Sequence, residues 1–370
     1  MILRRIFLYF KQFDWILFIT AFLLVCFGLA AIYSIGLSRE IPDFLNFKKQ
    51  IFSFIVGITL LFFFSFLDYK LLKNYYIVLY CLAAILLGVV LIFGRTIHGT
   101  TGWFSYGIFS FQPVEFVKLI LIIFLAKYFS DYSRELGRFQ YIILSGIFTG
   151  ILIFLVLLQP DFGSALILFI LWFGMLVVVG IKRSHLFLIF GLIAIMVIGS
   201  WFFALKPYQK DRVLTFLNPS FDPLGRGYSM TQSVVAVGSG KFFGRGLGFG
   251  SQSQLRFLPE SQTDLIFAVI AEELGFAGVI FILGFFIILF YRISRNAREI
   301  GDDFGLFFTL GALILLFAQS FVNIGMNIGM APITGITLPF ISYGGSSLVT
   351  NLIILGVLES IFIRNKKPEI

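Results

Sequence analysis

Residues 258–275 read LPESQTDLIFAVIAEELG, a stretch in which acidic side chains flank and interrupt an apolar run. Glu260 and Asp264 precede the run, whereas Glu272 and Glu273 lie inside it. An ionisable side chain within a membrane is costly unless it is paired or faces a cavity. The pattern therefore predicts a membrane helix with a polar site at its start, provided that the whole chain has the character of a membrane protein.

The composition of the chain is that of a membrane protein. Its 370 residues are 59% hydrophobic and 13% charged, and the mean hydropathy of +0.99 lies far outside the range of soluble domains. Cys26 and Cys81 both lie in apolar runs, where a thiol behaves as a small hydrophobic group. The net charge of +9 indicates no nucleic-acid partner here, because membrane proteins carry excess Lys and Arg on one side.

Ten apolar runs are long enough, at about 18 to 25 residues each, to cross a bilayer as helices. They predict an all-α, polytopic integral membrane protein that forms a single transmembrane domain over residues 1–370, with a large extracytoplasmic loop at 206–263 between helices 7 and 8. The first run is too long for a signal peptide and predicts a retained helix. The runs are 15–36, 50–67, 74–94, 112–130, 141–158, 162–180, 186–205, 264–291, 304–328 and 340–363.

The distribution of Lys and Arg predicts the orientation of these helices. Short cytoplasmic connections carry excess Lys and Arg. One set of connections, taken with both chain ends, holds sixteen such residues, whereas the short connections on the other side hold four. We therefore expect both termini in the cytoplasm and the loop 206–263 on the outer face.

The outer face also holds the unusual sequence. Its connections 94–113, 159–164 and 329–347 are rich in Gly, Pro, Ser and Gln, which predicts irregular backbone that lines a cavity or packs within the protein. The chain contains no Walker A motif, no complete G-x-G-x-x-G after a strand and no Cys or His cluster with metal spacing. We therefore expect an outward-facing site that uses neither a nucleotide nor a dedicated metal centre.

Asp264 is the first candidate for chemistry, because it lies at the outer mouth of the eighth predicted helix. A carboxylate there faces the positive end of the helix dipole, so a stabilising charge or cap is an equally weighted alternative. Glu272 and Glu273 lie about 12 to 14 Å further along the helix, and for them we favour structural pairing within the bundle.

Three more charged residues flank the outer connections. Glu115 and Lys118 share one face of the fourth helix and can pair, so an internal salt bridge and a substrate contact are both open. Asp161 is favoured as the cap of the sixth helix over a catalytic role.

The asparagines at 323 and 327 adjoin a G-x-x-x-G pattern that favours close helix packing.

The loop 206–263 is basic, which suits an anion with several oxygens because the guanidinium fork matches phosphate geometry. Contact with lipid headgroups is the alternative. Two classes of function stay open on these residues: a membrane enzyme that acts on a lipid-linked anion, and a transporter. We favour the enzyme, because polarity is confined to one face and internal repeats are not evident.

Five motifs resemble the signatures of the SEDS family of shape, elongation, division and sporulation proteins, over nearly the whole chain and in order. They are FQPVEFVKL (111–119), QPDFGSAL (159–166), DRVLTFLNPSFDPLGRGY (211–228), SQSQLRFLPESQTDLIFAVIAEELG (251–275) and PFISYGGSS (339–347). Within the family, SQSQLRFLPE and the short N-terminus resemble the rod-shape branch, RodA, more than the division branch, FtsW.

The resemblance implies an inverting peptidoglycan glycosyltransferase that polymerises lipid II on the outer face of the bacterial cytoplasmic membrane, for cell elongation and shape. It implies a class B penicillin-binding protein, a transpeptidase, as partner, and Asp264 as general base. A lipid II flippase or a non-catalytic scaffold for that partner is the alternative, and a division-specific FtsW-type polymerase is the alternative within the family.

The resemblance also implies which residues bind the substrate. A divalent cation, Mg or Mn, could share the pyrophosphate charge, although no ligand set in the sequence demands one. The family commonly has Arg and Ser where this chain has Gly102 and Val114, so a phosphate contact by that Arg is not expected here. The implied substrate-binding residues are Lys118, Glu115, Arg212, Lys49, Gln112, Gln159, Asp161, Arg226, Arg245, Arg256, Ser342 and Ser346.

Overall fold

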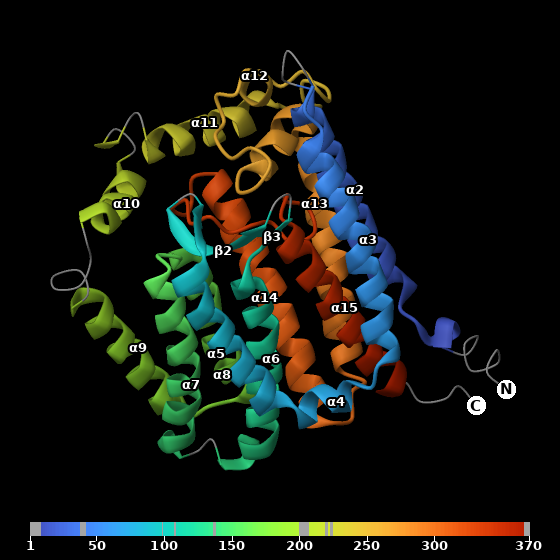
Figure 1. The fold of residues 1–370 in the computed structure, drawn as a ribbon, viewed down its shortest axis with the longest axis vertical. Coiled ribbons are helices and arrows are strands. Elements are labelled where there is room, and N and C mark those ends of the chain that lie inside the picture. The colour runs from blue at the N-terminus through green and yellow to red at the C-terminus, as the bar shows by residue number, and fades with distance from the viewer. Residues whose placement is uncertain are drawn as a thin grey trace.

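The chain folds into a bundle of long helices in a computed structural model (Figure 1). The structure describes residues 9–37, 42–97, 99–106, 109–135, 138–199, 207–218, 221–222 and 225–365. Among these residues, eight helices are long and apolar enough to cross a membrane. They are α2 (Trp15–Gly36), α3 (Leu45–Phe66), α5 (Tyr76–Phe93), α7 (Phe139–Leu158), α8 (Phe162–Val179), α13 (Ile266–Ala297), α14 (Asp303–Asn327) and α15 (Gly345–Asn365).

Helices also occupy the other two predicted ranges, although residues 200–205 of the range 186–205 lie outside the described residues. They are α6 (Pro113–Tyr132) and α9 (Arg183–Gly199). α6 packs against α5 and α14 and is buried along most of its length, so it occupies the interior of the bundle. Short connecting elements, α4 (Tyr69–Asn74) and the 3-10 turn η1 (Ser133–Glu135), follow α3 and α6.

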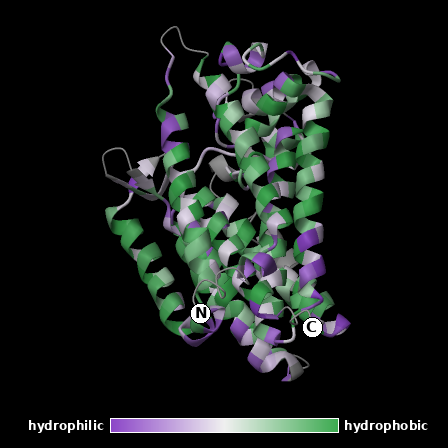
Figure 2. Cartoon of the chain, turned by 90° about the vertical axis from the view of Figure 1, so that its right-hand side faces the viewer, coloured by the Kyte–Doolittle hydropathy of each residue, from purple (hydrophilic) through white to green (hydrophobic). Residues whose placement is uncertain are grey.

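The outside of the bundle is apolar (Figure 2). Ile92, Phe154 and Phe321 are 77%, 61% and 68% exposed, although each lies in the middle or the last turns of an apolar helix. Large apolar side chains face outward in this way when lipid, rather than water, surrounds the helices. The chain is therefore a multi-pass membrane protein.

α3 and α15 cross closely through glycines. A Cβ on Gly356 would lie 2.4 Å from the carbonyl oxygen of Leu61, and a Cβ on Gly57 would lie 2.4 Å from a methyl carbon of Leu352. Small residues let helix backbones approach closely in membranes, where packing rather than the hydrophobic effect drives association. These contacts pack the middle of α15 against α3.

A buried polar cluster joins three helices at the end opposite the polar loops. Asp14, the N-cap of α2, accepts hydrogen bonds from Arg292 at 2.7 Å and from Asn296 at 2.7 Å, both in α13. The Asp14 backbone N–H donates to Glu359 of α15 at 3.0 Å. Breaking such a buried network by removing one partner is strongly destabilising, so the cluster fixes α2, α13 and α15 relative to one another.

Two features depart from the predicted fold. The connection 94–113 forms an antiparallel sheet of β1 (Arg95–Ile97), β2 (Thr100–Tyr106) and β3 (Phe109–Phe111), with Ser105 opposite Ser110. Thr, Trp, Phe and Tyr in TTGWFSY favour strands. The loop 206–263 contains α10 (Pro207–Leu217), α11 (Arg226–Ser239) and α12 (Ser251–Gln254), which lie across one end of the bundle (Figure 1).

Glu272 and Glu273 lie in α13, the eighth predicted helix, and hold the loop 206–263 in place. Glu272 accepts hydrogen bonds from the backbone N–H groups of Gln252 at 2.7 Å and Ser253 at 3.0 Å. Glu273 accepts from the Ser34 hydroxyl of α2 at 2.6 Å. Gly275 has φ 66 and interrupts the helical geometry of α13. The backbone carbonyls before Gly275 are therefore available to accept hydrogen bonds from the loop. These contacts agree with the expected architectural role of the pair.

Candidate active site

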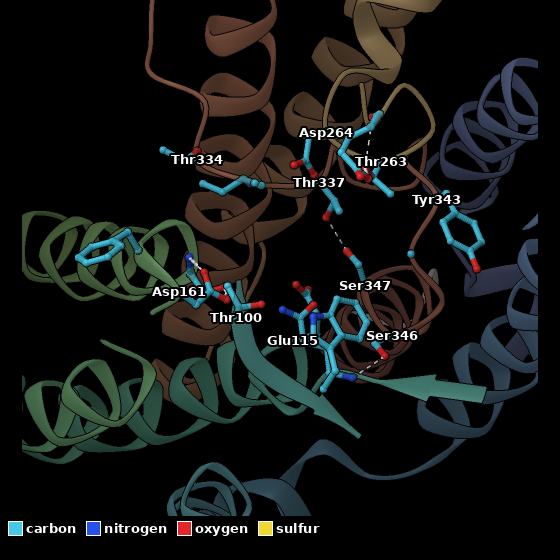
Figure 3. A pocket seen from close by; sticks show the side chains of 18 of the residues that line it. Thr100, Glu115, Asp161, Thr263, Asp264, Thr334, Thr337, Tyr343, Ser346 and Ser347 are labelled. Carbon is cyan, nitrogen blue, oxygen red and sulfur yellow. Dashed lines mark hydrogen bonds between the residues drawn. The ribbon is translucent and has the colours of Figure 1, made fainter. Parts of the chain in front are cut away.

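A cavity of about 370 Å³ lies where the sheet, four helix starts and the connection before α15 meet (Figure 3). Most of its polar lining comes from connections that the sequence places on one side of the membrane. The lining residues are Thr100, Trp103, Ser110, Gln112, Glu115, Lys118, Pro160, Asp161, Phe162, Ser164, Glu260, Thr263, Asp264, Ile333, Thr334, Gly335, Ile336, Thr337, Tyr343, Gly344, Ser346 and Ser347.

Asp264 lines this cavity two residues before α13 begins. Part of its surface faces the cavity, while the surrounding walls enclose the rest. This burial, together with the negative charges of Glu260 and Asp161, raises the pKa of Asp264 to about 7. A carboxyl group with a pKa near the working pH is well matched to accept a proton from a reacting hydroxyl.

Lys118 and Glu115 form an ion pair on α6, one of the two roles that the sequence left open. Lys118 Nζ lies 2.7 Å from Glu115 Oε1, and the side chains are only 4% and 7% exposed. Among the described residues that line the cavity, Lys118 is the only Lys or Arg. An ammonium group has three N–H donors, so its pairing with Glu115 leaves capacity for an anionic ligand.

Asp161 is the N-cap of α8, as favoured from the sequence. Its carboxylate accepts hydrogen bonds from the Ser164 N–H at 2.9 Å and from the Ser164 hydroxyl at 2.8 Å. Burial raises the pKa of Asp161, and the hydrogen bonds from Ser164 and the positive charge of Lys118 oppose that rise. The same side chain lines the cavity, so capping does not remove it from the site.

Gln112 and Ser346 also line the cavity, as the motifs imply. The Gln112 N–H donates to the Ser346 hydroxyl at 3.0 Å, which joins the start of α6 to the start of α15. In the described part of the chain, the sequence-implied residues that line this cavity are Asp264, Lys118, Glu115, Asp161, Gln112 and Ser346.

Two implied residues support the walls without lining the cavity. The Ser342 hydroxyl donates to the Thr263 carbonyl at 2.6 Å and accepts from the Leu338 N–H at 2.8 Å. Gln159 is buried, and its backbone carbonyl accepts from the Thr101 N–H of β2 at 3.3 Å. These contacts position the turn before Asp264 and the sheet.

Three implied basic residues, Arg245, Arg256 and Lys49, do not line the cavity. Arg245 is exposed on the long loop and donates to the Ser251 hydroxyl at 2.9 Å, and Arg256 is exposed with φ 58. Lys49 lies in α3 and is not a lining residue. The side chains of Arg212 and Arg226 lie outside the described residues, so a substrate contact by any of these five residues stays a prediction.

Several lining residues were not predicted. Thr337 and Ser347 line the cavity with their hydroxyl oxygens 3.0 Å apart (Figure 3), and Trp103 lines it from β2. In the sequence, the SYGGSS motif points to Ser347, whereas no motif points to Thr337. In the part of the chain that the structure describes, no group of three or more His, Cys, Asp and Glu is placed to hold a metal ion.

One carboxyl group with a near-neutral pKa, one buried cation and several hydroxyls thus share a cavity at the end of a membrane bundle. Residues 14–367 match a protein-family model described as "Cell cycle protein", which groups FtsW, RodA and SpoVE. The chain belongs to this family. The family-level prediction is therefore confirmed.

Two relatives show how far the similarity extends. Stage V sporulation protein E of Bacillus subtilis (strain 168) is 38% identical over 360 residues, covering 94% of this chain and 96% of that protein. A protein of Haemophilus influenzae (strain ATCC 51907 / DSM 11121 / KW20 / Rd), named "Probable peptidoglycan glycosyltransferase FtsW", is 40% identical over 293 residues, covering 78% and 73%. Members of the FtsW/RodA/SpoVE family thus match this chain across most of its length.

Solved structures share the fold. One chain, from a structure described as "Structural coordination of polymerization and crosslinking by a peptidoglycan synthase complex", is 32% identical, with a TM-score of 0.82 and coverage of 95% of this chain and 98% of that chain. The rod shape determining protein RodA of Thermus thermophilus is 29% identical, with a TM-score of 0.72 and coverage of 96% and 98%. The narrower resemblance to RodA stays a prediction.

Proposed function

We propose that this chain is a peptidoglycan glycosyltransferase that polymerises lipid II into glycan strands, and that the cavity around Asp264 is its active site. The observation that carries the proposal is that a candidate base and a buried cation line the same cavity. Asp264, with a pKa of about 7, shares it with the buried cation Lys118. Glycosyl transfer from a lipid pyrophosphate needs both a base and a positive group for the leaving anion.

Asp264 is the proposed general base. Its carboxylate accepts the proton of the acceptor GlcNAc 4-hydroxyl as that oxygen bonds to the anomeric carbon of the donor MurNAc. The bond from that carbon to the pyrophosphate breaks in the same displacement, so an α-linked donor gives a β-1,4 product. Base catalysis of this kind contributes about 10² to 10⁴ in rate.

Lys118 is the proposed partner of the leaving pyrophosphate. Its burial makes the charge interaction stronger than it is in water, and Glu115 holds the ammonium at 2.7 Å. A diphosphate carries more charge than one ammonium balances, so additional cations are expected. The basic residues of the long loop and a divalent cation, Mg or Mn, stay predictions for that role.

The proposed topology has ten transmembrane helices in the bacterial cytoplasmic membrane, with α6 and α9 as the two spans beyond the eight apolar helices. Both termini are placed in the cytoplasm and the cavity on the outer face. The asymmetry of sixteen Lys and Arg against four supports this orientation. The short connections at the cavity end belong to the side poor in these residues, and the long basic loop 206–263 is not part of this count.

A class B penicillin-binding protein, which crosslinks the product, is the proposed partner. The fold match to a chain of a peptidoglycan synthase complex that coordinates polymerization and crosslinking supports this assignment. We assign the chain to cell elongation and shape maintenance, with an FtsW-type division role as the alternative within the family. A lipid II flippase or a scaffold for the partner is the alternative outside catalysis.

Reconstitution with purified lipid II, with and without a class B transpeptidase, tests the function. Asp264→Asn should abolish polymer formation while the protein still folds and binds its partner. Asp222→Asn is the matched control, because this loop carboxylate does not line the cavity. Full polymerising activity in Asp264→Asn would contradict the base assignment, and movement of lipid II across liposomes without polymer would favour the flippase.

A further inference from the structure

Two asparagines of α14 hold the backbone of Asp264. Asn323 Nδ2 donates to the Asp264 carbonyl oxygen at 2.9 Å, and Asn327 Nδ2 donates to the same oxygen at 3.0 Å. Both side chains are completely buried, and neither lines the cavity. A carbonyl oxygen has two lone pairs, so the two carboxamides occupy the full accepting capacity of this carbonyl. The Asp264 peptide cannot rotate without losing both hydrogen bonds.

Asn323 also binds the wall against which the carboxylate packs. Its Nδ2 donates to the Ile336 carbonyl at 2.7 Å. The residue before Ile336 is Gly335, where an added Cβ would lie 3.6 Å from Asp264 Oδ2. A single carboxamide therefore joins the backbone that carries the Asp264 carboxylate to the backbone that encloses it.

Asn327 fixes the beginning of α13. Its Oδ1 accepts from the Ala268 N–H at 3.1 Å, in the first turn of that helix. The same N–H also donates to the Leu265 carbonyl at 3.1 Å, so Asn327 supplies a second acceptor to the first turn of α13 from the neighbouring helix. Its Nδ2 also donates to the Asn323 carbonyl at 2.8 Å. The spacing of four residues puts both asparagines on the same face of α14.

From this geometry we propose that Asn323 and Asn327 are positioning residues, which hold the Asp264 carboxylate at a fixed place beside the reacting hydroxyl. The inference rests on the proposed function, because it assigns the pair a role in the same reaction. Helix packing alone does not account for the pair, since its donors converge on one carbonyl and on the cavity wall rather than on a neighbouring apolar surface. Displacement of a catalytic group by about 1 Å can lower a rate about 100-fold.

The charged groups around Asp264 make the pH profile a sensitive readout of its position. Glu260 lies before α13, Asp161 begins α8, and Glu115 and Lys118 face the cavity from α6. None of them is bonded to Asn323 or Asn327. A change in the profile of an asparagine variant therefore reports a change in the enclosure of Asp264 itself.

The test uses the full-length protein reconstituted with lipid II and a class B transpeptidase. Asn323→Ala should lower kcat about 10-fold to 100-fold while KM for lipid II changes less than about twofold. The acidic limb of the kcat/KM profile should move to lower pH, because a loosened wall admits water to the carboxylate. Asn323→Gln, which keeps the carboxamide, should recover part of the rate.

Gln319→Ala is the matched control. Gln319 is buried on α14 one turn before Asn323, so its replacement costs similar packing without touching Asp264. This control should keep the wild-type pH profile. If Asn323→Ala fails to fold, Asn327→Ala is tested in its place. This variant keeps the hydrogen bonds that Asn323 donates to the Asp264 and Ile336 carbonyls, so it should give a smaller change of the same kind.

The outcomes separate the two proposals. A wild-type kcat and pH profile in Asn323→Ala, or a change equal to that of Gln319→Ala, would overturn the positioning role while Asp264→Asn stays inactive. Polymerising activity in Asp264→Asn would instead overturn the proposed function itself. A selective fall in kcat together with a shifted acidic limb supports the positioning role.

Discussion

Asp161 and Asp264 line one cavity from the starts of two different helices, and the negative charge of Asp161 helps to raise the pKa of Asp264. Burial makes the larger contribution, and Glu260 adds to it. The cavity therefore keeps one carboxyl group close to half-protonated at neutral pH, while Asp161 is held by two hydrogen bonds from Ser164. The two aspartates thus have different roles because their environments differ.

The pH dependence of polymerisation should report this arrangement. A general base works only when it is deprotonated, so kcat/KM should rise with pH through about 7 and then level off. Initial rates of lipid II consumption, measured across this pH range, define the acidic limb of the kcat/KM profile. An acidic limb near the ordinary aspartate value of about 4 would contradict the raised pKa.

Replacement of Asp161 should move that limb. Asp161→Asn removes a negative charge that raises the pKa of Asp264, so the limb should shift to lower pH. Asn caps a helix about as well as Asp, so α8 should still begin at the same place, which circular dichroism and thermal unfolding check. A shift to higher pH would show that Asp161 does not act on Asp264 through its charge.

The raised pKa of Asp264 also predicts a pH-dependent stability. Between its ordinary pKa and about 7 the folded protein binds more protons than the unfolded chain, so stability is highest below this window and falls as pH rises through it. Asp264→Asn removes this effect. Above pH 7 the variant should be more stable than the wild type by at most about 4 kcal/mol, since water in the cavity screens the charge.

Thermal unfolding in detergent measures the difference. The wild type should lose stability relative to Asp264→Asn as pH rises through the window, whereas the two proteins should converge below about pH 4. Parallel curves at every pH would show that Asp264 is not enclosed as the structure places it.

The long helices were predictable from the sequence because hydropathy is a local property. The apolar runs that became α2 and α14 differ from the predicted ranges by a few residues at most. The start of α15 was predicted too early, because residues before Gly345 include Phe340 with φ 66. Such a left-handed residue is incompatible with a regular helix.

The cavity was only partly predictable, because its residues meet through packing of distant segments. Asp264, Lys118 and Asp161 carried their own signal, since charge is rare in apolar surroundings. Thr337 and Trp103 carried none, because a lone hydroxyl or indole near a membrane surface is ordinary until the structure places it in a cavity. The basic residues of the long loop stay a prediction, because Arg245 and Arg256 are exposed away from the cavity lining and the side chains of Arg212 and Arg226 lie outside the described residues.

Gly356 tests the close crossing of α3 and α15. Gly356→Ala puts a Cβ within 2.4 Å of the Leu61 carbonyl oxygen, so the helices must separate, with a cost of about 1 to 3 kcal/mol. Gly88→Ala is the matched control, because no atom lies within 4 Å of its added Cβ and alanine favours a helix. Equal unfolding temperatures for the two variants would show that the crossing is looser than described.

Removal of the Lys118 and Glu115 charges separates their structural and catalytic roles. Lys118→Met leaves Glu115 buried without its partner, so stability should fall by about 3 to 5 kcal/mol and polymerisation should stop. The double variant Lys118→Met, Glu115→Gln removes both charges and should recover most of the stability, because no unpaired charge is left buried.

The double variant should nevertheless stay inactive, because the cavity then lacks the cation proposed for the pyrophosphate. Lys127→Met with Asp131→Asn is the matched control: this ion pair lies on the same helix but is more exposed, at 20% and 39%. Exposed pairs contribute at most about 1 kcal/mol, so the control should fold and polymerise normally. Thermal unfolding and lipid II polymerisation measure both outcomes. Normal polymerisation by the double Lys118 and Glu115 variant would mean that Lys118 serves only to pair Glu115.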